Sequence, residues 1–180
     1  PFLLLFFFFW MGFMMNQIIV AFYLEQHIGI EGDANVARAA ASALVAMAIW
    51  ATGMQFFIIK RKSLGPQQML RIGFPAFAIG AMILYFATSM IGIWVAFSLF
   101  GISMAMANAG IAGGASISVE PHEQGAIGGL LSAAPIFGMV IGPLIGPALF
   151  DFYGPQAPAL VAAITFTLLS IYAFTVKVSV

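Results

Sequence analysis

The chain has 180 residues, of which 63% are hydrophobic and 7% are charged, and its formal net charge is zero. A soluble domain carries roughly a quarter charged residues, so this composition excludes a water-soluble globular protein and predicts one surrounded by lipid. The absence of cysteine excludes disulfides, thiolate nucleophiles and cysteine-ligated metal sites, and the zero net charge argues against nucleic acid as a partner.

Six apolar runs are each long enough to cross a bilayer core of about 30 Å as a helix. In chain order they cover approximately residues 2–24, 39–59, 72–88, 91–119, 126–150 and 157–176. Helix is the open-chain structure that satisfies its own backbone hydrogen bonds in lipid. The sequence therefore predicts an all-α polytopic membrane protein with six transmembrane helices and short connections.

Asn16 and Gln17 lie in the middle of the first run, Asn108 lies near the middle of the fourth, and Gln55 lies toward one end of the second. Polar groups are costly at membrane depth, so these amides are candidates to face a substrate cavity. For Asn108 an interhelical hydrogen bond is an equal alternative, and for Gln55 a gating or packing role is favoured. Changing Asn16 to alanine should alter substrate preference if it faces the cavity, and only the amount of inserted protein if it holds helices together.

The spans have no acid at their centres, so the sequence offers no evident proton carrier. Glu25 and His27, just past the first run, are first of all loop residues and the remaining candidates for a coupling role. Ser116 has no histidine within a span to act as its base, which argues against an intramembrane protease. The spans contain no cluster of carboxylates or histidines for a metal, and we expect neither an enzyme nor a cofactor.

Basic residues lie mostly on one side of the predicted helices. The opposite side has only Arg38, whereas the first side carries Lys60, Arg61, Lys62, Arg71 and Lys177. Because basic residues in short loops favour the cytoplasm, we expect a multi-pass protein of the cell membrane with both chain ends cytoplasmic. The connection at residues 120–124 is cytoplasmic on this count although it contains no Lys or Arg.

The fifth run contains small residues and prolines in the pattern G-x8-G-x3-G-P-x2-G. Its members are Gly129, Gly138, Gly142, Pro143 and Gly146, followed by Pro147. Small residues four apart share one helix face and let another helix approach closely, while proline loosens the backbone beside them. We expect the approaching helix to belong to a part of the protein absent from this chain, so Gly142→Leu should disrupt transport.

Three stretches resemble the C-terminal six-helix half of a major facilitator superfamily transporter, most closely the drug:proton antiporters that include tetracycline efflux pumps. Residues 129–146 resemble the antiporter motif as it recurs, weakened, in the eleventh helix, with Pro147 in place of the final glycine. Residues 55–70 resemble the degenerate loop signature between the eighth and ninth helices, which here contains Lys60 and Arg61, with Gly65 at its second glycine and Lys62 where the signature has an acid. Residues 123–125 resemble the entry to the eleventh helix.

The resemblance implies that residues 1–180 are helices 7–12 of a twelve-helix transporter. The fourth run has no charge before Glu120, whereas an N-terminal half is expected to carry an arginine there. The implied partner is an N-terminal six-helix half that supplies the coupling acids, and the abrupt apolar start at Pro1 suggests that upstream sequence exists. The implied function is alternating-access, proton-coupled efflux of drugs or other amphipathic small molecules.

Two other functions stay open on the residues alone. Within the superfamily the alternative is a metabolite or sugar exporter, although a sugar site would be expected to show more hydrogen-bonding side chains than this chain has. Outside that class, a non-transporting membrane scaffold or a dimeric six-helix half-transporter would also use closely packed glycine-rich helices.

Overall fold

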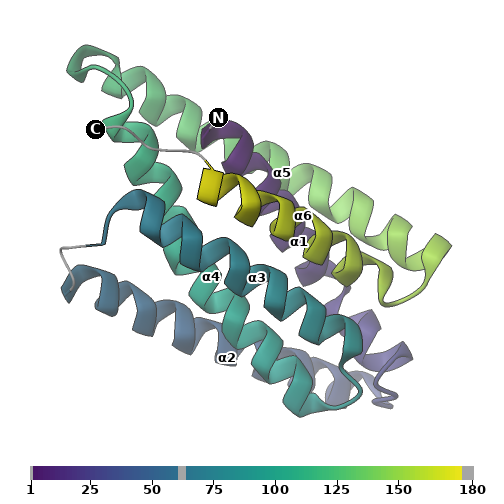
Figure 1. The fold of residues 1–180 in the computed structure, drawn as a ribbon. Coiled ribbons are helices and arrows are strands. Elements are labelled where there is room, and N and C mark those ends of the chain that lie inside the picture. The colour runs from purple at the N-terminus through teal and green to yellow at the C-terminus, as the bar shows by residue number, and fades with distance from the viewer. Residues whose placement is uncertain (1, 61–63, 176–180) are drawn as a thin grey trace.

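The computed structural model describes residues 2–60 and 64–175, and these contain six long helices joined by short connections (Figure 1). Each of the six is long and apolar enough to cross a membrane, and the described residues form no strand. The predicted all-α fold with six spans is therefore confirmed. The helices are α1 (Phe2–Gln26), α2 (Asp33–Lys60), α3 (Pro66–Phe86), α4 (Met90–Ile117), α5 (Gln124–Tyr153) and α6 (Ala157–Thr175), with a short 3-10 turn, η1 (Pro121–Glu123), before α5.

Several helices extend past their apolar runs into polar sequence. α2 begins at Asp33 and α3 at Pro66, in each case more than a turn before the run that hydropathy located. An acid in the first turn favours a helix N-terminus, and proline is well suited to the first helical position. Hydropathy marks the stretch that lies in hydrocarbon, whereas the helix itself continues to the point where local chemistry ends it.

The six helices are arranged in two layers. α2 packs on α4, α4 touches α1, and α1 packs on α5, which gives a row in the order α2, α4, α1, α5. We call this row the four-helix wall. The second layer consists of α3 and α6, which pack on each other and cover α4 and α1; in Figure 1 they lie nearest the viewer.

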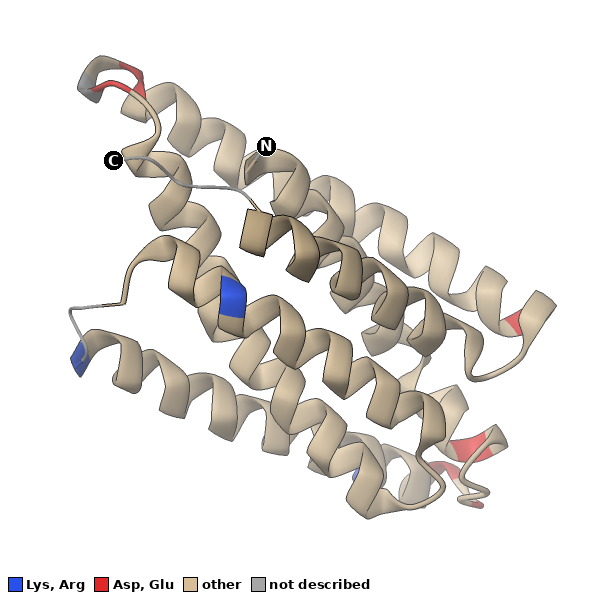
Figure 2. Cartoon of the chain, viewed as in Figure 1, with Lys and Arg blue, Asp and Glu red and all other residues tan. Residues whose placement is uncertain are grey.

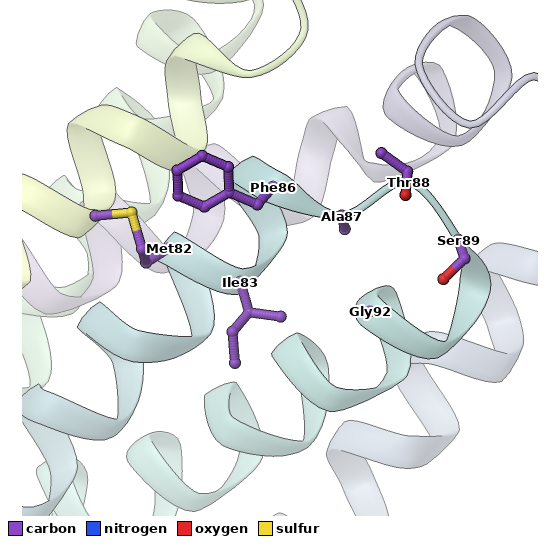
Figure 3. A pocket seen from close by; sticks show the side chains of 7 residues that line it. All are labelled: Met82, Ile83, Phe86, Ala87, Thr88, Ser89 and Gly92. Carbon is purple, nitrogen blue, oxygen red and sulfur yellow. The ribbon is translucent and has the colours of Figure 1, made fainter.

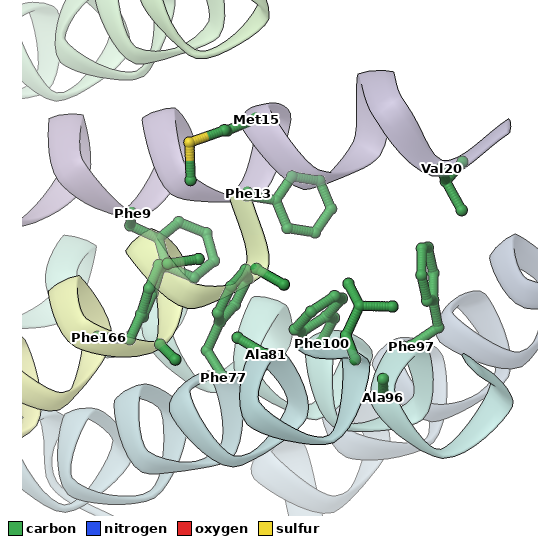
Figure 4. Packing of buried hydrophobic residues seen from close by; sticks show 14 of the residues in the cluster. Phe9, Phe13, Met15, Val20, Phe77, Ala81, Ala96, Phe97, Phe100 and Phe166 are labelled. Atoms are coloured by element: carbon green, nitrogen blue, oxygen red, sulfur yellow. The ribbon is translucent and has the colours of Figure 1, made fainter. Parts of the chain in front are cut away.

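An aromatic cluster fills the space between the two layers (Figure 4). The ring of Phe77 on α3 stacks on Phe166 of α6 at a centroid distance of 3.8 Å and on Phe100 of α4 at 4.2 Å. Phe9 of α1 meets Phe166 edge-on at 5.8 Å. Close packing of this kind, rather than escape from water, is what holds helices together in lipid.

Side chains from neighbouring helices satisfy the C-terminal ends of both second-layer helices. The Tyr23 hydroxyl of α1 donates to the Leu84 carbonyl of α3 at 2.5 Å. The Arg71 guanidinium of α3 donates to the carbonyls of Ala173 and Phe174 on α6, each at 3.3 Å. The last carbonyls of a helix lack partners within it, so these contacts cap the helices. The Tyr23 contact joins the two layers, and the Arg71 contact joins α3 to α6 within the second layer.

Most charged residues lie at or near the two ends of the bundle, and both ends of the described chain lie at one of them (Figure 2). We call the end with the termini the terminal end and the other the distal end. Arg61, Lys62 and Lys177, which contribute to the predicted orientation, lie outside the described residues. By their places in the helices and connections, the residues toward the terminal end are Lys60, Arg71 in the second turn of α3, Glu120 and Glu123, and those toward the distal end are Glu25, Glu31, Asp33, Arg38 and Asp151.

Candidate functional site

α5 docks on α1 through a row of three glycines. A Cβ placed on Gly142 would lie 2.5 Å from the carbonyl oxygen of Met11, and one on Gly146 would lie 2.6 Å from that of Met15. The same construction on Gly138 reaches the backbone of Phe7 at 2.5 Å. The backbones of the two helices therefore touch, as the four-residue spacing predicts.

The helix that meets this glycine row is a correction to the sequence-based expectation. We expected a helix from outside this chain, but the row packs against α1 of the chain itself. Spacing identifies the face of a helix that is built for close approach, and it carries no information about which helix approaches.

The rest of the glycine and proline motif lies apart from this contact. Gly129 is exposed, and nothing lies within 4 Å of a Cβ placed on it. Pro143 and Pro147 are half-buried, and α5 continues as one helix through both of them. The motif therefore divides into a docked part toward the distal end and an open part toward the terminal end.

A stripe of four half-buried residues runs along the face of α1 that belongs to the four-helix wall. Trp10, Met14, Gln17 and Ala21 follow at helical spacing, and we call them the α1 stripe. At one end the Cβ of Trp10 lies 3.0 Å from the Cβ position of Gly138 on α5. At Gln17 the amide Nε2 lies 3.7 Å from the sulfur of Met47 on α2. The stripe thus lies between the two outermost helices of the wall.

Met47 joins three helices of the wall at this point. Its backbone also lies against α4, where a Cβ on Gly101 would collide with the Met47 carbonyl. Gln17 is therefore placed at the junction of α1, α2 and α4, near the middle of its helix.

Four side-chain polar atoms in the described part of the chain are buried without a hydrogen-bond partner, and three of them belong to α1. They are the indole Nε1 of Trp10, Oδ1 of Asn16, Oε1 of Gln17 and the hydroxyl of Ser103 on α4. An unpaired buried polar group costs about 1–3 kcal/mol. Within the described residues, α1 therefore holds one donor and two acceptors that are buried without a hydrogen-bond partner.

The four predicted cavity amides occupy different surroundings. Asn16 is 2% exposed, lies on the aromatic core face of α1, and donates to the Gly12 carbonyl at 2.9 Å. Asn108 is half-buried and donates to the Met104 carbonyl of its own helix at 2.7 Å. Gln55 is exposed on α2. Of the four, Gln17 is the one placed on the α1 stripe.

The candidate coupling residues lie at the distal end. Glu25 is exposed, whereas the His27 ring lies 4.8 Å from that of Tyr23 and its Nε2 lies 3.2 Å from the amide nitrogen of Gln156. At the other end of the bundle, Lys60 is the exposed last residue of α2, and Gly65 precedes α3 with its N–H donating to the Gln68 side chain at 3.3 Å. Arg61 and Lys62 lie outside the described residues.

Sequence reasoning missed Trp10 and Ser103. Trp10 is not among the residues predicted from the sequence, yet its indole nitrogen is buried and unpaired. The available signal was its position seven residues before Gln17, which places both on one helix face. Ser103 has no such neighbour, and no sequence signal marks it.

The described residues thus form a bundle of six helices of spanning length, with unpaired buried polar atoms on α1 and α4. The chain belongs to the Major Facilitator Superfamily, whose family model matches residues 2–179. This membership identifies a transporter-family protein of the membrane rather than an enzyme.

Solved structures share this fold, among them two of a peptide transporter. Crystal structures of a mutant peptide transporter, POT, match the chain with a TM-score of 0.80 in the complex with sulfate and 0.79 in the complex with alafosfalin, each at 16% identity. Each match covers 96% of this chain but 36% and 37% of the respective transporter chain, so the chain spans little more than a third of their length. At this identity the likeness shows the fold alone. Curated proteins give no match to the chain.

Proposed function

We propose that this chain is the C-terminal half, helices 7–12, of a twelve-helix secondary transporter, with both ends cytoplasmic. The four-helix wall lines one side of the transport path, and an N-terminal half completes it from the other side. Two such halves rocking about a midplane site give each face of the membrane access in turn.

The poor burial of the outermost wall helices supports a missing half. In α2 the buried residues are Val36 and Ala43, although the helix is 28 residues long. The open part of α5 presents Gly125 and Gly128, each with nothing within 4 Å of an added Cβ. Exposed glycines of this kind are suited to the close approach of another helix, and a helix surface that meets lipid has no need of them.

The assignment to the C-terminal half rests on α4 and on the resemblance of the loop before α3. α4 has no charged residue between Met90 and Ile117, where an N-terminal half of this class is expected to have an arginine. The loop with Lys60 and Gly65 is similar to the degenerate copy of the superfamily's loop signature.

The proposal for the class of substrate rests on the α1 stripe. It combines the apolar Trp10 and Met14 with an indole donor and the amide of Gln17, and it contains no charge. Such a surface suits an amphipathic molecule with few polar groups, so we propose efflux of drugs or similar compounds. A metabolite or sugar exporter is the alternative within the superfamily.

Proton coupling is assigned mainly to the N-terminal half. The acids within the described helices lie close to helix ends: Glu25 is the second-last residue of α1, Asp33 the first of α2 and Asp151 the third-last of α5. A carboxylate that carries protons through the membrane has to face each side in turn, which these positions do not favour. Glu25 and His27 remain weaker candidates at the distal end.

The test is transport by the full transporter in proteoliposomes with an imposed pH gradient. We expect a fluorescent lipophilic amine with a permanent quaternary charge, which an acid lumen does not trap by protonation, to accumulate in inside-out vesicles with an acidic lumen, and a protonophore to abolish the accumulation. A hexose and a dipeptide complete the panel, the latter because the structural neighbours are peptide transporters. Preferential movement of the hexose or the dipeptide would overturn the drug assignment, and movement of none of the three would favour a scaffold.

A matched pair of variants links the activity to the α1 stripe. Gln17→Leu should slow amine transport about tenfold, because one lost hydrogen bond to substrate is worth on the order of 1 kcal/mol or more. Ile18→Leu, at the neighbouring exposed position, should leave the rate unchanged.

A further inference from the structure

A groove opens at the distal end, where α3 ends and α4 begins (Figure 3). Its volume is about 320 Å³, and Met82, Ile83 and Phe86 of α3 form its apolar part. Gly92 of α4 borders it, on the side of α4 that faces the end of α3. A water molecule occupies about 30 Å³ of liquid, so the groove is far larger than a single-water site.

The groove lies on the surface that faces lipid. It belongs to the end of α3, in the layer that covers the four-helix wall from behind, so a half placed against the front of the wall does not cover it. Phe86 is 69% exposed and Met82 is 42% exposed. In a chain with six spans, large apolar side chains on such a surface are solvated by acyl chains.

The mouth of the groove is polar but uncharged. Thr88 and Ser89 form the turn between the helices, both are exposed, and the Ser89 side chain makes no capping hydrogen bond to α4. A helix end is where the hydrocarbon gives way to the headgroup region. The groove therefore has hydroxyl donors at headgroup depth and an apolar surface leading toward the bilayer interior.

The charge of the distal end determines which lipid headgroups are favoured beside the groove. Arg38 is the one basic residue among the described residues there, against the acids Glu25, Glu31, Asp33 and Asp151. The resulting negative potential repels an anionic headgroup and tolerates one that also carries a positive charge.

We propose that this groove binds one zwitterionic glycerophospholipid from the leaflet at the distal end. An acyl chain lies along Met82 and Phe86, and the ester or phosphate oxygens accept hydrogen bonds from Thr88 and Ser89. This site is independent of the substrate that the protein transports, because it depends on the chain spanning the membrane and not on the α1 stripe.

Photolabelling of the full transporter in lipid nanodiscs tests the proposal. The probe is a phosphatidylcholine with a diazirine near the ester end of one acyl chain, compared with a phosphatidylglycerol of the same chains. We expect phosphatidylcholine label to concentrate on peptides covering residues 82–92, and phosphatidylglycerol label there to be severalfold lower. Equal labelling by the two lipids would overturn the headgroup assignment.

Two matched variants separate the groove from the general lipid-facing surface. Met82→Trp fills the groove and should lower labelling there about fivefold, whereas Ile79→Trp, exposed one turn earlier and outside the groove, should not. Changing Thr88 and Ser89 together to alanine should give a similar loss through the hydrogen bonds alone. Equal labelling in all these proteins, or a groove protected from lipid by the rest of the transporter, would overturn the site.

Discussion

Replacing Gly142 with alanine would place a methyl carbon 2.5 Å from the carbonyl oxygen of Met11 and 3.1 Å from the backbone nitrogen of Met15. Real Cβ atoms essentially never lie within 3.0 Å of a non-neighbouring heavy atom. Because both obstacles are backbone atoms of α1, no side chain can rotate to make room. α5 therefore has to move away from α1 by at least about 0.5 Å, the difference between 2.5 Å and 3.0 Å, and the neighbouring glycine contacts open with it.

The expected cost follows from two opposing effects. Overpacking costs about 1–3 kcal/mol, while alanine is favoured over glycine within a helix by about 1 kcal/mol. Gly129→Ala is the matched control on the same helix, since nothing lies within 4 Å of its added Cβ. The control gains the helix preference without the clash, so the two variants should differ in unfolding free energy by about 1–3 kcal/mol.

The measurement is thermal unfolding of the full transporter in detergent, together with its transport rate in proteoliposomes. We expect Gly142→Ala to unfold at a lower temperature than Gly129→Ala and to transport more slowly, and Gly142→Leu to be worse than Gly142→Ala. Equal unfolding temperatures for the two alanine variants would refute the docking of α5 on α1 through this glycine. A loss confined to Gly129→Ala would place the critical contact in the open part of α5, against the second half.

Three further outcomes are expected. Tyr23→Phe removes the hydrogen bond to the α3 C-terminus and should lower stability by about 1 kcal/mol, measured by thermal unfolding; an unchanged unfolding temperature would show that the hydroxyl does not cap α3. Arg71→Lys loses the forked donor to the last carbonyls of α6 and should speed hydrogen exchange in its final turn, which the control Arg38→Lys should leave unchanged. Asn16→Ala should change the ratio of transport rates for two amines if its free Oδ1 meets substrate; a fall in inserted protein at a constant ratio would assign it to helix packing.

Hydropathy was sufficient to find all six spans because lipid imposes a simple rule on every helix that crosses it. Hydropathy placed the start of α2 too late, because the helix already begins at Asp33, and residues 33–38 lie outside the apolar run. Helix ends depend on local chemistry such as the proline that begins α3, and a hydropathy window averages over it.

The candidate site was less accessible to sequence reasoning because it depends on which helices meet. The glycine spacing of α5 correctly indicated a close contact, but α1 could not be named as its partner from spacing. The adjacent amides Asn16 and Gln17 were grouped together, although a one-residue step turns a side chain by about 100° around a helix and places them on different faces. Trp10 was not predicted because the sequence of an apolar run does not indicate that an indole nitrogen is buried without a partner.

The central claim, that the four-helix wall lines a transport path, is tested most directly by cysteine accessibility at two adjacent positions. The chain has no cysteine, so labelling of Gln17→Cys or Ile18→Cys has no contribution from other thiols in this half. Any cysteines elsewhere in the transporter are replaced beforehand. We expect a membrane-impermeant thiol reagent to label Gln17→Cys and transported substrate to protect it. Substrate should leave the labelling of Ile18→Cys unchanged, because this exposed side chain is turned by about 100° around α1 from Gln17. Protection of Ile18→Cys in place of Gln17→Cys, or labelling of Gln17→Cys that substrate leaves unchanged, would contradict the account.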